Sequence, residues 1–278
     1  MLFRSTQRQF NKGYCGANND IVIAKYYLHP FEEPMISGTN GSGTVFFCGC
    51  SLKCVFCQNY ELSRNMRGKT ISPFEFTEIV KELESKGAHN INLVNPTHFS
   101  SKIINALEIY RPNIPIVYNS HGYENLEILK KIDKYIDVYL PDIKFFSPVL
   151  SKKYCNKENY FSVASRAIEF MANKPLFFDE NGFIKSGTIV RHLILPLASS
   201  DSKKILDWFT SIKDKCYIHV MSQYTPFGEI DKFPELKRKI TPREYQTVLD
   251  YAISLNIEKA FYQDDKSADA SYIPVWDF

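Results

Sequence analysis

The sequence of 278 residues predicts an α/β fold in which parallel strands alternate with helices. From Gly43 onward, short apolar runs rich in β-branched residues alternate with longer segments whose apolar residues recur at helical spacing. This alternation is typical of βα units on a parallel sheet. The length also suits one large core, because α/β barrels of this size occur as undivided domains. Six strand signals therefore predict six βα units.

Each predicted strand is a short apolar run bounded by polar or turn-forming residues. These runs are 44–47, 91–94, 116–118, 138–140, 189–195 and 217–221. The helical patterns are 73–86, 98–110, 125–135, 161–172, 202–213 and 242–255. Thr241 is a suitable N-cap for the last helix, because proline stands at its first position.

Two segments interrupt the alternation. Residues 1–42 contain Pro, Gly and Asn clusters and one short strand signal at 21–24, so we expect an N-terminal extension that lies against a barrel formed by residues 43–278. Residues 179–182, between the apolar runs 176–178 and 183–184, predict a small hairpin turn.

Composition excludes several classes of function. The net charge is only +3, and Lys and Arg are dispersed among Asp and Glu, so nucleic acid is not expected as a partner. No segment approaches the roughly 18 uninterrupted apolar residues of a membrane span, and the first ten residues lack an apolar leader. Seven cysteines without a leader fit a reducing compartment. We therefore expect a cytoplasmic protein that does not contact a membrane.

The most specific motif comprises Cys50, Cys54 and Cys57, a C-x3-C-x2-C spacing directly after the strand signal at 44–47. A [4Fe-4S] cluster takes four thiolates, one for each iron. Three thiols would leave one iron open to a substrate or cofactor. The motif therefore indicates an iron-sulfur centre that takes part in chemistry.

Two other kinds of cysteine site were weighed against the cluster. A zinc site usually shows two C-x2-C or His-containing halves, and no second pair follows Cys54 and Cys57. A disulfide framework is more typical of short secreted chains. A noncatalytic metal-binding module remains an alternative to an enzyme.

With Phe56 directly before the third cysteine, the motif resembles that of the radical S-adenosylmethionine (radical SAM) superfamily. The resemblance implies that Cys50, Cys54 and Cys57 bind a [4Fe-4S] cluster and that Phe56 lies beside the adenine of S-adenosylmethionine. In that family, the reduced cluster cleaves the cofactor to methionine and a 5′-deoxyadenosyl radical, which abstracts hydrogen from the substrate. An oxygen-labile cluster further implies an anaerobic or microaerobic cell.

Further segments resemble an uncharacterised family that is similar to the pyruvate formate-lyase activating enzyme. They include Glu32-Glu33-Pro34, Cys57-Gln58-Asn59-Tyr60, Tyr139-Leu140-Pro141-Asp142-Ile143-Lys144 and Val190-Arg191-His192-Leu193. This resemblance implies a partial, open (β/α)6 barrel of the TIM type. It also implies an electron donor such as flavodoxin or ferredoxin, and it makes a glycyl radical enzyme a candidate partner.

In such folds the chemistry gathers at the carboxyl ends of the strands, where polar residues stand in this sequence. By resemblance, Asn95 and Thr97 would meet the amino group of S-adenosylmethionine, although the Gly-Gly-Glu-like segment of the family is absent. Asn119 and Ser120 would lie near the ribose and carboxylate, together with Asp142. The alternatives are a helix start at residues 96–97 and a plain strand-to-helix turn at residues 119–122.

Asp142 and Lys144 should lie on the same side of the fourth strand, because side chains alternate along extended backbone. They could form a plain salt bridge or bind a zwitterionic ligand. Arg191, inside the fifth strand, would carry a costly unpaired charge unless a carboxylate or ribose ligand offset it. By resemblance, Lys144 and Arg191 bind the cofactor, and we expect Lys144, Asp142 and His121 to be the catalytic residues.

By resemblance, the first candidate for the hydrogen donor is a glycine loop of a partner glycyl radical enzyme, and the alternatives are a peptide and a small metabolite. A glycine loop needs a wide cavity near Asn95, His121 and Tyr224 with partners for peptide amides. A small metabolite needs a closed pocket with converging charged anchors. We expect the segment around Glu32, Glu33 and Ser37 to decide this point by covering the opening or leaving it free.

Overall fold

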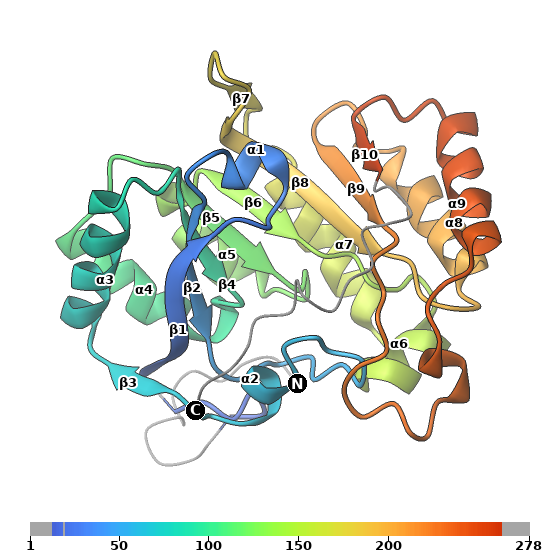
Figure 1. Cartoon of the computed structure of the whole chain (residues 1–278), viewed down its shortest axis with the longest axis horizontal. Coiled ribbons are helices and arrows are strands. Elements are labelled where there is room, and N and C mark those ends of the chain that lie inside the picture. Colours follow the sequence, from blue (N-terminus) through green and yellow to red (C-terminus); the bar gives the residue numbers. More distant parts are fainter. Residues whose placement is uncertain (1–12, 19, 263–278) are drawn as a thin grey trace.

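A computed structural model of the chain describes residues 13–18 and 20–262. In these residues, parallel strands alternate with outer helices from Ser42 onward, as the sequence predicts (Figure 1). The parallel strands are β2 (Ser42–Phe47), β4 (Ile91–Val94), β5 (Ile116–Ser120), β6 (Val138–Pro141), β8 (Ile184–Leu193), β9 (Tyr217–Met221) and β10 (Ala260–Tyr262). All six predicted strands are present.

The strands follow the order β10-β9-β8-β6-β5-β4-β2-β1-β3 across one curved sheet. In the described part of the chain, β10 at one edge pairs only with β9, and β3 (Lys69–Ile71) at the other edge pairs only with β1 (Ile21–His29). The sheet is therefore an open, partial barrel rather than a closed one. The seventh parallel strand, β10, was not predicted, because three partly exposed residues give no clear apolar pattern.

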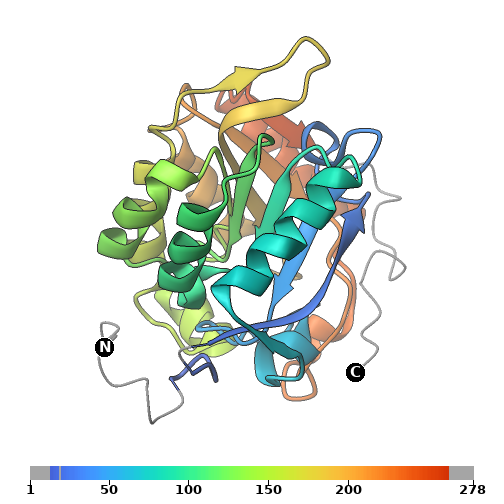
Figure 2. The same ribbon diagram turned by 90° about the vertical axis from the view of Figure 1, so that its left-hand side faces the viewer.

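The outer helices cover one face of this sheet (Figure 2). They are α3 (Pro73–Ser85), α4 (Ser100–Ile109), α5 (Leu126–Ile132), α7 (Tyr160–Met171), α8 (Ser199–Phe209) and α9 (Pro242–Ser254). Capping boxes fix the starts of two of them: Ser72 and Glu75 at α3, and Thr241 and Glu244 at α9. The cap predicted at Thr241 is thereby confirmed.

Three short helices were not predicted: α1 (Pro34–Ser37), α2 (Tyr60–Arg64) and α6 (Pro148–Cys155). Each is too short for an apolar period to be recognised in the sequence. The predicted hairpin is confirmed, since β7 (Phe177–Phe178) pairs antiparallel with the start of β8. This pairing also explains why β8 begins before residue 189, where the strand was expected.

The described residues before Ser42 add strand β1 to the sheet and then reach the amino-terminal end of its parallel strands. β1 pairs antiparallel with β2 and is about twice as long as the signal at 21–24 indicated. Its last residue, His29, pairs with Ser42 at the amino end of β2. The chain then passes through Glu32 and Glu33 into α1 at the amino-terminal end of the parallel strands, opposite the end that carries the cysteines (Figure 1). A domain boundary at residue 42 stays a prediction.

Candidate active site

The cysteine motif forms an irregular loop directly after β2. Gly49 makes the turn with a φ of +84°, and a side chain there would meet the Cys15 carbonyl at 2.5 Å. Backbone hydrogen bonds from Cys50 to the Cys15 carbonyl and from Val55 to the Tyr154 carbonyl hold the loop in place. Long-range contacts therefore fix the loop before any metal is bound.

Cys50, Cys54 and Cys57 all line one cavity of about 530 Å³, here called the main cavity. Its volume lies in the range of small-molecule sites, roughly 300–1,000 Å³. Burial raises the pKa of Cys50 to about 12, with a further contribution from the two neighbouring thiols. The protein alone therefore keeps these thiols protonated, and a bound metal would deprotonate them.

The donor set fits an iron-sulfur cluster better than a single ion. Among residues 13–18 and 20–262, no three His, Cys, Asp or Glu side chains converge closely enough to hold one metal ion. In a cube each thiolate binds a different iron, so its ligands stand farther apart. Three thiols on one wall of a ligand-sized cavity meet this requirement and leave space beside them.

The other cysteines take different positions. The Cys48 thiol donates to the Arg67 carbonyl at 3.1 Å, and Cys48 does not line the main cavity. Cys155 donates to the Ser151 carbonyl at 3.0 Å and lies beside Cys54. Cys15 and Cys216 are buried free thiols. None of the four shares the cavity wall with the motif cysteines.

Phe56 also faces the main cavity, and aromatic rings hold it there. Its ring packs edge-on against Phe145, Tyr154 and Tyr224, with centroid distances of 6.0, 6.2 and 6.2 Å. Tyr224 itself is buried and donates to the Leu236 carbonyl at 2.8 Å. It supports Phe56 and is not among the residues that line the cavity.

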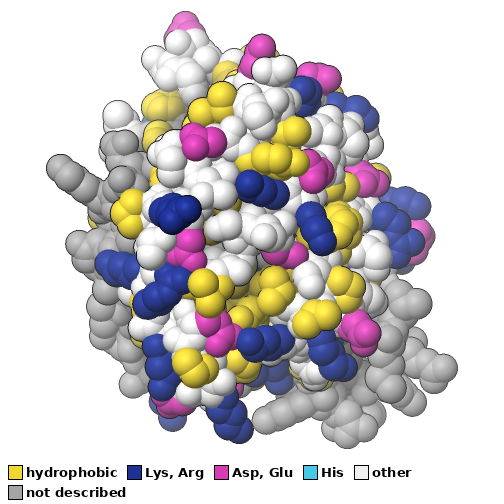
Figure 3. Space-filling model, turned by 90° about the vertical axis from the view of Figure 1, so that its right-hand side faces the viewer, with side chains coloured by type: hydrophobic (Ala, Val, Ile, Leu, Met, Phe, Trp, Pro, Cys, Tyr) yellow, Lys and Arg dark blue, Asp and Glu magenta, His cyan; other side chains and the backbone are white. Residues whose placement is uncertain are grey.

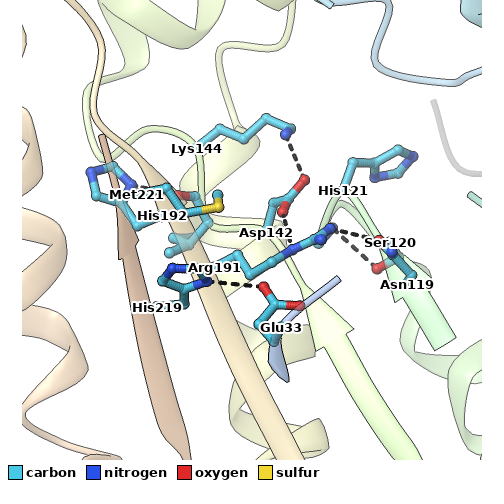
Figure 4. Close-up of polar contacts among 12 residues, drawn as sticks. Glu33, Asn119, Ser120, His121, Asp142, Lys144, Arg191, His192, His219 and Met221 are labelled. Atoms are coloured by element: carbon cyan, nitrogen blue, oxygen red, sulfur yellow. Dashed lines mark hydrogen bonds and ion pairs between the residues drawn. The ribbon is translucent and has the colours of Figure 1, made fainter. Parts of the chain in front are cut away.

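A charged network lines the same cavity as the cysteines (Figure 4). Asp142 accepts from Lys144 Nζ at 2.7 Å and from Arg191 Nε at 3.0 Å. The expectation that Asp142 and Lys144 share one side is confirmed. Arg191 also donates to Asn119 Oδ1 at 2.6 Å and to Glu32 Oε2 at 3.3 Å. Carboxylates of the protein, Asp142 and Glu32, therefore already offset the Arg191 charge that we expected a ligand to offset.

Burial and charge act against one another in this network. Burial would raise the pKa of Asp142, but Arg191 and Lys144 outweigh it and hold the pKa below its usual value. Burial would likewise lower the pKa of Lys144, and Asp142 raises it. Burial raises the pKa of Glu32 to about 7 although Arg191 and Asn92 counteract it. Asp142, Lys144 and Arg191 are therefore charged, and Glu32 titrates near neutrality.

Some of the polar residues at the ends of β4 and β5 line the main cavity, and one lies outside its lining. Asn95, Asn119 and Ser120 line the main cavity, and Asn95 is held by a 2.5 Å hydrogen bond to the Gly49 carbonyl. Thr97 lies outside the lining, and its hydroxyl donates to Glu124 Oε1 at 2.7 Å. The structure thus brings Asn95 and Asn119 together and points Thr97 elsewhere.

His121 lines the cavity as a neutral side chain. Its Nδ1 accepts from the backbone N–H of Tyr123 at 3.1 Å, so Nε2 carries the proton and donates to Ser51 Oγ at 3.0 Å. Burial and, to a smaller extent, the charge of Lys144 lower the pKa of His121 to about 3. The side chain can therefore donate one hydrogen bond but does not carry a charge at neutral pH.

The sequence indicated no site role for His219 and Glu124, and it pointed to Glu32 and Glu33 only as part of a segment that could cover the opening. Glu32 and Glu33 reach the strand residues Asn92, Arg191 and His219 from an irregular segment before α1. No local pattern marks these contacts, because the partners are remote in sequence. The motif around Glu32 and Glu33 was the only available signal.

Comparisons with known proteins agree with this site. The profile of the Radical SAM superfamily matches residues 44–177. An uncharacterised protein of Methanocaldococcus jannaschii is 30% identical over 260 residues, which cover 90% of this chain and 72% of the relative.

Two solved structures are similar at low sequence identity. A domain of a pyruvate-formate lyase-activating enzyme from Bacteroides vulgatus shares 13% identity with a TM-score of 0.40, over 69% of this chain and 91% of that domain. Methylornithine synthase shares 16% identity with a TM-score of 0.49, over 77% of this chain and 60% of that one. From the profile match, the archaeal relative and the cysteine motif together, the chain belongs to the radical SAM superfamily, whose members use a [4Fe-4S] cluster and S-adenosylmethionine.

Proposed function

We propose that Cys50, Cys54 and Cys57 hold the [4Fe-4S] cluster, that the main cavity binds S-adenosylmethionine, and that a small molecule gives up the hydrogen atom. When bound and reduced, the cluster supplies the electron that cleaves S-adenosylmethionine to methionine and a 5′-deoxyadenosyl radical. The observation that carries the proposal is the position of three thiols and a buried charged network on the walls of one ligand-sized cavity.

Each side of the cavity offers groups for one part of the cofactor. Lys144 and Arg191 are cationic donors for carboxylate or ribose oxygens, and Arg191 presents a planar fork. Asn119 and Ser120 can bond to hydroxyl groups, and Asn95 offers a buried amide oxygen that accepts no hydrogen bond from any described residue. Phe56 supplies an apolar surface for the adenine. Thr97 lies outside the cavity lining, so it would affect cofactor binding only indirectly, through its bond to Glu124 and through helix α4.

Asp142 and His121 would position groups in the cavity. Asp142 orients both Lys144 and Arg191, so its loss would disturb both cationic donors. Neutral His121 can hold a polar group with its Nε2–H if Ser51 releases it. Either side chain could contact substrate as well as cofactor, because both line the cavity.

A small molecule is favoured over a protein loop as hydrogen donor because charged groups converge at the end of the main cavity where Glu32 lies. Phe31 and Glu32 line this end, and Glu32 is tied to Arg191 and Asn92. Converging charges suit a compact ligand with its own charged groups. An extended glycine loop would have to displace or bypass these ion pairs.

Activation of a glycyl radical enzyme, or modification of another peptide, is the second candidate. One observation favours it: the Asn95 and Asn119 side chains in the main cavity could bond to peptide amides. The resemblance of the sequence motifs to an activating-enzyme family points the same way. For either reaction, a protein segment would have to pass the charged network around Arg191 and Glu32.

The hydrogen donor can be identified by isotope transfer. A fully deuterated cell extract would first be separated into small-molecule and macromolecular fractions. Each fraction would then be incubated anaerobically with the reconstituted protein, S-adenosylmethionine and dithionite. Deuterium in 5′-deoxyadenosine is expected only with the small-molecule fraction. Deuterium only with the macromolecular fraction would replace our proposal with the second candidate. Cys50→Ala serves as the control, because it should form no 5′-deoxyadenosine.

For the physiological reaction, we propose that flavodoxin or ferredoxin supplies the electron in the cytoplasm of an anaerobic or microaerobic cell. The support is indirect: all seven cysteines lie in the described residues, and all are free thiols, as in a reducing compartment. The described residues contain no helix long and apolar enough to cross a membrane.

A further inference from the structure

A second cavity of about 320 Å³, here called the inner pocket, adjoins the main cavity. The two share Glu32, Arg191, Met221 and Gln223 among their lining residues. Glu33, His219, Met35 and Phe261 line the inner pocket alone. It lies between the segment around α1 and strands β8, β9 and β10, away from the cysteine loop. None of the groups assigned to the cofactor belongs exclusively to this pocket.

Glu33 is the central polar group of the inner pocket. Only 5% of its side chain is exposed. Oε1 pairs with His219 Nδ1 at 3.0 Å, as Figure 4 shows. Oε2 is also buried but accepts no hydrogen bond from any described residue. A buried acceptor without a donor is costly, so a group from outside the protein, either ligand or water, should bond to it.

The charge balance identifies the kind of donor that is missing. Three described carboxylates line the two cavities: Glu32, Glu33 and Asp142. Two lining side chains, Lys144 and Arg191, are cations at neutral pH. Three negative against two positive charges leave one surplus negative charge when all are ionised. Both cations already pair with Asp142, and Arg191 also pairs with Glu32. Arg191 also lowers the pKa of Glu33, so the surplus is shared between Glu32 and Glu33. Both carboxylates line the inner pocket, where a cation would be stabilised.

The remaining walls of the inner pocket are largely apolar. Phe31, Met35 and Phe261 contribute hydrocarbon and aromatic surface. Phe31 and Tyr262 are 58% and 36% exposed, so the pocket reaches the surface beside β10. A ligand that fits must therefore join a cationic donor to an apolar carbon skeleton. The volume lies at the lower end of the range for small-molecule sites.

We infer that the inner pocket binds the ammonium group of a small-molecule amine, with Glu33 Oε2 as the principal acceptor. Glu32 shares the positive charge, His219 fixes the Glu33 carboxylate, and the apolar walls hold the carbon skeleton. That this amine is the hydrogen donor rests on the proposed function. The binding itself depends only on the residues of the pocket.

Three probes of equal length test the charge preference. Butylammonium, butanol and butanoate would each be titrated into the reconstituted protein in the presence of S-adenosylmethionine but without reductant, with binding followed by ligand-observed NMR. A charge-assisted hydrogen bond in a buried site predicts that butylammonium binds at least about tenfold more tightly than butanol. Butanoate should bind more weakly than either.

A variant locates the binding. Glu33→Gln preserves the shape but removes the charge, and it should weaken butylammonium binding about tenfold while butanol binding changes little. Glu180→Gln, at an exposed turn, is the matched control and should bind all three probes as the wild type does. A thermal unfolding curve would show that both variants are folded. If Glu33→Gln does not fold, the wild-type probe series still decides the charge preference.

Equal binding of butylammonium and butanol to the wild type would overturn the inference, and so would a folded Glu33→Gln variant that still prefers the amine. Failure of the proposed function would be seen differently, as no reductive cleavage of S-adenosylmethionine by the wild type. The two results are independent, because the probe titrations contain no reductant.

Discussion

The cysteine loop and the charged network line the same main cavity, but the chain builds them in different ways. The loop gathers Cys50, Cys54 and Cys57 within eight residues of sequence. The network joins residues that are far apart: Glu32 and Arg191 are separated by 159 positions, and Glu33 and His219 by 186. The spacing of the three thiols is thus set by local sequence, although long-range backbone bonds hold the loop in place. The network, in contrast, exists only after the whole barrel has formed.

This difference predicts different costs of substitution. A motif cysteine is a small buried side chain whose special role begins when metal binds, so its loss should remove the cluster and spare the fold. The Arg191 cation offsets the cost of burying the Asp142 and Glu32 carboxylates. Its loss would leave these charges without that compensation in the interior. Substitutions can therefore separate the chemistry of one region from the stability of the other.

The largest expected effect is on the loop. Cys50→Ala, Cys54→Ala or Cys57→Ala should each abolish reductive cleavage of S-adenosylmethionine, because loss of one ligand exposes a second iron. Iron content, the visible absorbance of the cluster and 5′-deoxyadenosine would be measured after reconstitution. Cys48→Ala is the matched control and should remain active. Loss of the cluster in Cys48→Ala together with its retention in Cys50→Ala would refute the ligand assignment.

The next largest effect should come from Arg191→Ala. Removing one partner from a buried ion-pair network costs about 3–5 kcal/mol of the free energy of unfolding. Lys144→Ala should cost less, because Asp142 keeps its bond to Arg191. Urea unfolding would measure both. In each folded variant, S-adenosylmethionine should bind more weakly while the cluster absorbance is retained. Equal stability in Arg191→Ala and the wild type would mean that the network does not support the fold.

A smaller, pH-dependent effect concerns Glu124, which lies behind the cavity. Burial raises its pKa to about 7 despite hydrogen bonds from Thr97, Ser120 and Tyr118. The unfolded carboxyl has a pKa near 4.5. Between these values the folded state binds the extra proton. The contribution of Glu124 to stability is therefore fully present below pH 4.5 and is lost as the pH rises through 7.

Replacing this group should flatten the profile. Glu124→Gln should remove a loss on the order of 3 kcal/mol between pH 5 and pH 8, relative to the wild type. Urea unfolding at both pH values would measure the difference. Parallel profiles for the two proteins would show that Glu124 keeps an ordinary pKa in the folded state.

The smallest effect should come from an exposed ion pair. Lys130 and Glu127 pair at 3.1 Å on α5, with 55% and 77% of their side chains exposed. Lys130→Ala should change the free energy of unfolding by less than about 0.5 kcal/mol, because water screens such pairs. A larger loss in the same urea measurement would remove the contrast between this pair and the buried network.

The sequence predicted those features that depend on local pattern. The six strands were recognised because each is a short apolar run, and the thiols because their spacing is distinctive. Glu32 and Glu33 could not be placed, since they stand in an irregular segment and act on residues of β4, β8 and β9. Arg191 was located correctly, but its carboxylate partners were not foreseen. Tyr224, three residues past the end of β9, packs against Phe56 and does not line the cavity.

Some assignments at the site also depend on side-chain direction, which sequence position does not determine. Thr97 follows β4 as expected but turns to Glu124. Asn95, two residues earlier, faces the cavity from a backbone with a φ of +61°. A two-residue shift at an irregular strand end is enough to change which group reaches the ligand.

The most direct test of the account is reductive cleavage by the wild-type protein itself. The protein would be reconstituted anaerobically with iron and sulfide, then mixed with S-adenosylmethionine and dithionite, and its products separated by chromatography. We predict equal amounts of methionine and 5′-deoxyadenosine, formed only when the cluster is present. A fully loaded [4Fe-4S] protein that leaves S-adenosylmethionine intact under these conditions would contradict the proposed function.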